Sequence, residues 1–66
     1  MKLGEKIKYI REDKNITQAT MADSLDLNRV TITGYEIGRR LPDVYTLKKI
    51  ADFLGVSMDY LLEEKL

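Results

Sequence analysis

Residues 17–41 read TQATMADSLDLNRVTITGYEIGRRL, which is two short helical patterns joined by a turn. The spacing of the apolar residues predicts one helix over about 18–25 and a second over about 29–37. Only Asp26-Leu27-Asn28 separates them, and so short a connection is typical of a tight helix–turn–helix rather than of an antiparallel helical hairpin. The sequence therefore predicts a helix–turn–helix at about 17–37.

The second of these helices has two distinct faces. At 100° per residue, one arc holds a buried set and the other an outward set. The buried set is Thr31, Ile32 and Tyr35, and the outward set is Arg29, Val30, Thr33, Gly34 and Ile37. The outward arc contains no acid and offers an arginine for a guanine edge, a hydroxyl group and a valine able to meet a thymine methyl group. A solvated face and a protein-binding face, the latter suggested by exposed Val30 and Ile37, remain as alternatives at this point.

The rest of the chain is also helical in its apolar spacing, and no period-2 run indicates a strand. Leu3, Ile7 and Ile10 predict a first helix over about 3–13, and two further helices follow Asp43 and Ser57. The expected N-caps are Thr17, Asn28, Asp43 and Ser57, and the expected C-terminal stops are Gly38 and Gly55. We expect an all-α fold of five helices forming a single domain over residues 1–66.

Composition excludes several classes of function. The chain has 66 residues, 11 basic against 11 acidic, and neither His nor Cys. It therefore has no ordinary zinc site, no disulfide and no Cys–His or Ser–His nucleophile, and we expect no cofactor and no enzymatic activity. The acidic residues near the C-terminus are interpreted as a solvated face. With no membrane-length apolar run and no signal-peptide pattern, we expect a cytoplasmic protein.

Short motifs along the whole chain resemble one family when they are taken in order. They are Ile10-Arg11-Glu12, Ile16-Thr17-Gln18, Met21-Ala22, Thr31-Ile32-x-x-Tyr35-Glu36-x-Gly38-x-Arg40-x-Pro42, Leu47-x-x-Ile50-Ala51-x-x-Leu54-Gly55-Val56-Ser57 and Asp59-Tyr60-Leu61-Leu62. In this order the sequence resembles the Cro/cI-type (Xre-family) helix–turn–helix repressors over about residues 4–62. The resemblance implies a lambda-repressor-like DNA-binding domain.

The resemblance also implies roles for individual residues. Positions that match base-reading positions of the family are Arg29, Val30, Thr33 and Gly34. Positions that match phosphate-contacting positions are Thr17, Gln18, Asn28, Arg39, Arg40 and Tyr45. Gln18 also matches a residue that braces the recognition helix, and Arg11 matches a structural partner of Glu36.

Two positions depart from the family pattern. Asp26 stands where the turn usually has Gly, and we expect it to adopt a left-handed backbone at slight cost. Gly34 stands where the recognition helix usually presents a long polar side chain. Either the helix approaches the groove more closely there, or specificity is reduced at that base pair.

The resulting hypothesis is a sequence-specific regulator of transcription, a repressor that binds double-stranded DNA at a palindromic operator. A homodimer is expected through the last helix, with Met58, Tyr60, Leu62 and Leu66 as its contacts. The alternative for that helix is that Met58 and Leu61 close the core. The alternative function is a protein-interaction module, such as an antitoxin-like partner that also binds its own operator.

Overall fold

The computed structural model describes residues 1–63. All regular structure in this part of the chain is helical: α1 (Leu3–Asp13), α2 (Gln18–Ser24), α3 (Arg29–Glu36), α4 (Val44–Leu54) and α5 (Met58–Leu62). The prediction of an all-α, five-helix fold is confirmed. The second and third helices end one residue earlier than predicted, because Leu25 and Ile37 are the C-caps.

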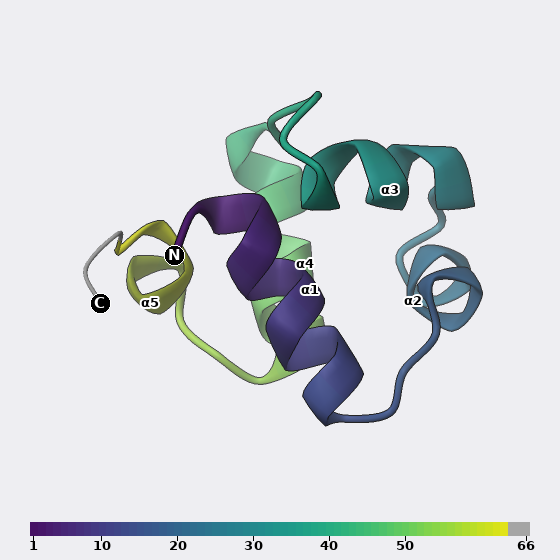
Figure 1. Ribbon diagram of the computed structural model, residues 1–66, viewed down its shortest axis with the longest axis horizontal. Helices are drawn as coiled ribbons and strands as arrows, with labels where there is room; N and C mark the ends of the chain where they lie inside the picture. The colour runs from purple at the N-terminus through teal and green to yellow at the C-terminus, as the bar shows by residue number, and fades with distance from the viewer. Residues whose placement is uncertain (64–66) are drawn as a thin grey trace.

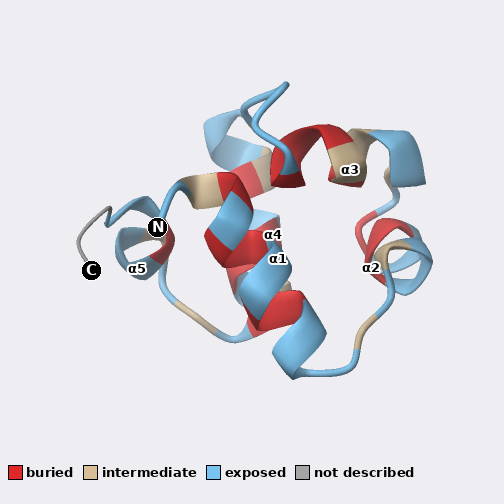
Figure 2. Ribbon diagram, in the orientation of Figure 1, coloured by how far each residue is buried: buried red, intermediate tan, exposed pale blue. Residues whose placement is uncertain are grey.

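The helices surround one core, to which each of them contributes. In Figure 1, α1 crosses the middle of the molecule in front of α4, α2 and α3 lie to one side, and α5 lies beside the N-terminus. Figure 2 shows buried residues where the helices face one another. The largest fully buried side chains are Ile7, Met21, Ile32, Ile50, Leu54 and Leu61. None of the five helices in residues 1–63 is long enough to be stable alone, so this shared burial holds them in place.

Three of the four predicted side-chain caps are present. The side-chain oxygens of Thr17, Asp43 and Ser57 accept hydrogen bonds from the backbone N–H groups three residues later, at 3.0, 2.8 and 2.9 Å. The expected side-chain cap at Asn28 is wrong. Asn28 has the extended N-cap backbone, but the N–H of Thr31 bonds to its backbone carbonyl at 3.1 Å, which leaves the side chain without a capping role.

The turn between α2 and α3 contains the predicted left-handed residue. Asp26 has φ 58°, which confirms that it takes the conformation usually reserved for Gly. Asn15, between α1 and α2, has φ 59° and was not anticipated. Both turns are short, and these residues allow the chain to reverse without a glycine.

Gly4 allows α1 to approach the end of α3 closely. A Cβ atom at this position would lie 2.2 Å from the carbonyl oxygen of Tyr35 and 2.7 Å from that of Glu36. Only a hydrogen atom fits in this space. The N-terminal turn of α1 therefore sets where the C-terminal end of α3 can lie.

Lys6 joins α1 to α5. Its side chain is buried, and its ammonium donates hydrogen bonds to the backbone carbonyls of Tyr60, at 2.8 Å, and Glu63. The same nitrogen lies 4.8 Å from the centre of the Tyr60 ring. The C-terminal carbonyls of a helix attract a cation, so Lys6 holds α5 against the start of α1.

Candidate nucleic-acid interface

The outer face of α3 exposes part of the predicted outward set. Val30 and Ile37 are 77% and 62% exposed, Arg29 is exposed, and Thr33 is half-buried. On the opposite face Ile32 and Tyr35 are buried and Thr31 is half-buried, which agrees with the helical projection.

Gly34 is the exception to this projection, because it is buried rather than exposed. A Cβ atom on Gly34 would lie 2.9 Å from Cδ and 3.1 Å from Cγ of Arg40. The side chain of Arg40 therefore covers the position. Periodicity within α3 cannot reveal this, because the covering residue comes from the loop after the helix.

Gln18 connects the start of α2 to the outward face of α3. Its Nε2 donates to Glu36 Oε1 at 3.0 Å. Its Oε1 accepts from Thr33 Oγ1 at 3.0 Å and from Arg29 Nε at 3.4 Å. The amide thus orients two of the side chains that the sequence assigned to base reading.

Arg11 and Glu36 form a buried, two-pronged ion pair behind this amide. Arg11 Nε donates to Glu36 Oε2 at 2.6 Å and Arg11 Nη2 donates to Oε1 at 3.1 Å, while Nη1 donates to the carbonyl of Ile16 at 2.7 Å. The two side chains are 8% and 1% exposed. The hydrogen bond to Glu36 raises the pKa of the Arg11 guanidinium, so this group stays charged. The Glu36 carboxylate is therefore compensated and turned away from the outer surface.

The loop between α3 and α4 lies on the same side of the molecule as the outer face of α3 (Figure 1). It presents Arg39 and Arg40, both exposed. The pocket between this loop and α3 is lined by Val30, Thr33, Gly34, Ile37, Arg39 and Arg40 and includes no acidic residue. This side of the molecule is suited to a negatively charged or electron-rich partner.

The remaining predicted phosphate contacts lie around α3. At the start of α4, Tyr45 is 80% exposed. Asn28 is exposed at the start of α3, and Thr17 is exposed at the start of α2. The hydrogen bond from the backbone N–H of Thr46 lowers the pKa of Asp43, which caps α4.

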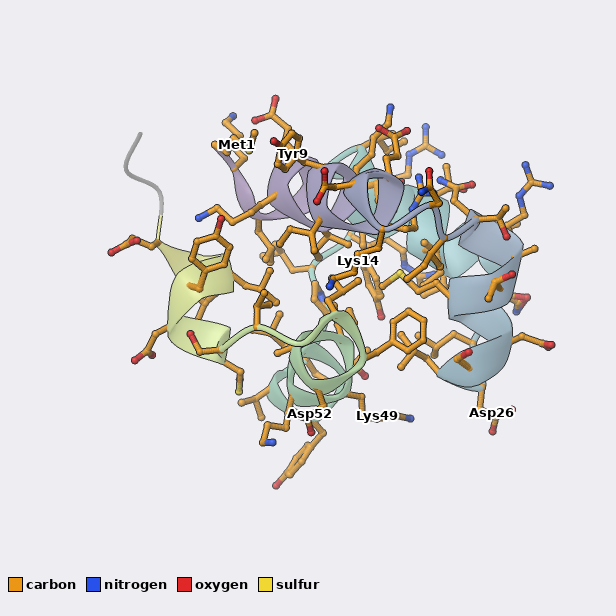
Figure 3. The ribbon with its side chains drawn as sticks, turned by 90° about the horizontal axis from the view of Figure 1, so that it is seen from below. Met1, Tyr9, Lys14, Asp26, Lys49 and Asp52 are labelled. Atoms are coloured by element: carbon orange, nitrogen blue, oxygen red, sulfur yellow. The ribbon has the colours of Figure 1, made fainter. Side chains whose placement is uncertain are left out.

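The side of the molecule away from α3 has a different charge pattern. Figure 3 views it from below, with Lys14, Asp26, Lys49 and Asp52 labelled. Both signs occur there, and Lys48 pairs with Asp52 at 2.9 Å. An excess of arginine over exposed acid is therefore a local property of the α3 side.

The structure exposes some of the predicted dimer contacts and packs another against the core. Tyr60 and Leu62 are 47% and 53% exposed, whereas Met58 is half-buried against the core. Leu61, which was the other candidate for closing the core, is fully buried. Leu66 lies outside the described residues.

Among the described residues no group of metal-ligating side chains occurs, and no helix is long and apolar enough to cross a membrane.

A family model described as helix-turn-helix (HTH_3) matches residues 7–61. Two curated relatives are similar over most of the chain. An uncharacterised HTH-type transcriptional regulator, YqaE of Bacillus subtilis (strain 168), is 48% identical over 60 residues, which is 91% of this chain and 52% of that protein. The cryptic phage CTXphi transcriptional repressor RstR of Vibrio cholerae is 41% identical over 61 residues, 92% of this chain and 54% of that protein. The chain thus spans about half the length of these curated relatives.

Among solved structures, the P22 c2 repressor protein in complex with a synthetic operator superposes with a TM-score of 0.92. The two chains are 28% identical, and the match covers 98% of each. The lambda-repressor-like arrangement of five helices expected from the sequence is therefore confirmed.

Proposed function

This chain belongs to the helix-turn-helix family, and on that premise we propose that it is a sequence-specific, double-stranded-DNA-binding regulator of transcription, acting as a repressor. The observation that carries the proposal is the braced outer face of α3. There Gln18 orients Arg29 and Thr33 beside a loop with two exposed arginines. The match to a repressor–operator complex and to a phage repressor supports the same function. The antitoxin-like alternative is not favoured, because the relatives are regulators and repressors.

In the proposed complex, α2 crosses the DNA backbone and the N-terminal half of α3 lies in the major groove. Arg29 reads a guanine edge, and Val30 meets a thymine methyl group. Thr17, Gln18, Asn28, Arg39 and Tyr45 contact phosphates on both sides of the groove. This function consists of contacts alone and requires no catalysis. We propose the cytoplasm as the place where this chain meets its operator.

One module of this size buries too little surface for tight operator binding, so we propose a homodimer on a palindromic operator. The exposed Tyr60 and Leu62 on α5 supply apolar surface for the contact. Sedimentation of the free protein at micromolar concentration tests this, with Leu62→Glu as the comparison. We expect the wild type to form dimers and the variant to be monomeric. A wild type that is strictly monomeric with and without operator DNA rules the dimer out.

The proposal is tested by selection from a random duplex library with the wild type and Arg29→Ala. We expect a palindromic motif from the wild type, and in the variant the loss of one guanine preference per half-site, worth about 1–3 kcal/mol. Lys14→Ala, on the opposite side of the molecule, is the control and leaves the motif unchanged. Weak, strongly salt-dependent binding with no enriched motif contradicts sequence-specific recognition.

A further inference from the structure

Gly34 has no side chain, and the space above it on the outward face of α3 is filled by the side chain of Arg40, which belongs to the following loop. The three atoms nearest to an added Cβ are Cδ, Cγ and Cβ of Arg40, at 2.9, 3.1 and 3.7 Å. The aliphatic stem of Arg40 therefore lies across the outward face of α3, in the space that a side chain at position 34 would take. Long basic side chains commonly pack their stem in this way and leave the charged end in solvent.

The backbone of the loop determines this placement. The N–H groups of Arg39 and Arg40 both donate to the carbonyl of Gly34, at 2.9 and 3.2 Å. Gly38, with φ 79°, lets the chain turn back over the end of α3. The loop is thus hydrogen-bonded to α3 at the residue that Arg40 covers.

The charged end of Arg40 is available to a ligand. Arg40 is exposed, and among residues 1–63 its guanidinium takes part in no ion pair. The pocket that it shares with Val30, Thr33 and Ile37 has no acidic wall. Arg11, by contrast, is buried and bound to Glu36, so it is not available to a ligand.

We propose that Arg40 is a base-reading residue, which takes the place of the side chain that Gly34 lacks and binds a guanine edge in the major groove. This inference rests on the proposed function, since it requires α3 to lie in the groove. Position 34 is five residues beyond Arg29, about 7.5 Å along the helix axis. We therefore expect Arg40 to read a different base pair from Arg29, displaced toward the C-terminal end of α3.

The role that the family resemblance implies for Arg40 is a different one, a phosphate contact without sequence preference. A base contact and a phosphate contact predict different behaviour on removal of the side chain. Loss of a bidentate contact to guanine affects one base pair, whereas loss of a phosphate contact weakens binding to all sequences and lowers the salt dependence by about one unit of slope.

The experiment compares duplex selections and binding isotherms for the wild type, Arg40→Ala and Arg39→Ala. Arg39 is the matched control, because it is the adjacent, equally charged residue of the same loop. For Arg40→Ala we expect preference for one guanine in each half-site to fall by about 5- to 150-fold while the other positions keep theirs. For Arg39→Ala we expect a uniform loss of affinity with an unchanged motif.

Two further variants test whether the guanine preference depends on the guanidinium of Arg40 and on where its side chain lies, or on its positive charge alone. Arg40→Lys keeps the aliphatic stem and the charge but lacks the planar guanidinium, so we expect the same guanine preference to be weakened. Gly34→Ala keeps Arg40 but places a methyl group 2.9 Å from its Cδ, which pushes the side chain off the helix and alters preference at that same base pair. Alanine is a better helix former than glycine, so a thermal melt should show that Gly34→Ala remains folded.

The outcomes separate this inference from the proposed function. A wild type with a clear motif, together with an Arg40→Ala variant that keeps the whole motif and only binds more weakly, overturns the role of Arg40 and leaves sequence-specific recognition intact. A wild type without any motif overturns both.

Discussion

The half of the molecule built from α2 and α3 is organised differently from the half built from α4 and α5. Behind the outer face of α3 lies a polar chain in which Arg11, Glu36 and Gln18 are joined by hydrogen bonds of 2.6–3.1 Å. The α4–α5 half has mainly apolar contacts, through the buried Leu47, Ile50, Leu54 and Leu61, and its hydrogen bonds from Lys6 join only the end of α5 to α1. Hydrogen bonds are directional and apolar contacts are not, so the polar half can fix the orientation of a surface while the apolar half mainly supplies stability.

The largest effect on stability is expected from removing the buried ion pair between Arg11 and Glu36. Arg11→Ala leaves the Glu36 carboxylate, 1% exposed, without its cationic partner, and we expect a loss of about 3–5 kcal/mol of unfolding free energy. The variant should lose more free energy of unfolding than free energy of DNA binding, when binding is measured for the molecules that remain folded. Urea unfolding and DNA titration of the same variant measure both quantities.

Lys8→Ala, an exposed cation on the same helix, is the control for Arg11→Ala. An unchanged unfolding free energy in Arg11→Ala contradicts the structural role of the pair. It would also remove the distinction between the two halves.

In the apolar half, Leu54→Ala should lower the unfolding free energy by about 2–5 kcal/mol, because Leu54 is fully buried and its loss leaves a cavity. We expect the DNA affinity of the folded fraction to be unaffected, since α4 holds Leu54 far from the outer face of α3. Tyr9→Ala, at an exposed position of α1 to which no contact with DNA or a second subunit is assigned, is the control and should change little. A change of base preference in Leu54→Ala would show that the two halves are coupled.

At the exposed end of the polar chain, Gln18→Ala should lower stability by only about 1 kcal/mol, because Arg11 still compensates Glu36. Its effect on DNA binding should be larger than its effect on stability, since Thr33 and Arg29 lose the acceptor that orients them. Differential scanning and operator titration measure the two effects. Ser24→Ala, an exposed position at the other end of α2, should alter neither.

The smallest effect concerns the cap of α4 and depends on pH. The folded-state pKa of Asp43 is lowered by the hydrogen bond from Thr46, so its contribution to stability is present above the unfolded pKa of about 3.9 and is lost as pH falls through the folded pKa. We expect Asp43→Ala to melt a few degrees below the wild type at neutral pH. The difference should shrink in melts at progressively lower acidic pH. A difference that is independent of pH contradicts the role of the charge.

The local features of this fold follow well from the sequence. Apolar spacing places the five helices to within about one residue, and Thr17, Asp43 and Ser57 cap them as expected. These features depend on neighbours within one or two helical turns, which a sequence pattern records directly. Asn28 shows where such a prediction fails. Its backbone carbonyl, and not its side chain, accepts the hydrogen bond from the N–H of Thr31 at the start of α3.

The candidate site was predicted in part. Arg29, Val30 and Thr33 lie on the outer face of α3, as the helical projection requires. Gly34 does not, because a residue six positions later covers it. The distance along the chain is short, but the cover depends on how the loop turns at Gly38, and no periodicity contains that information.

The sequence by itself determined the helices, their caps and turns, and the family to which the chain belongs, since each depends on residue types at close spacing. Only the tertiary structure decided how these parts contact one another. It pressed Gly4 against the carbonyls of α3, buried Lys6 on the end of α5 and laid Arg40 over Gly34. Such contacts depend on the angles at which helices and loops meet, and those angles arise from packing the whole core at once.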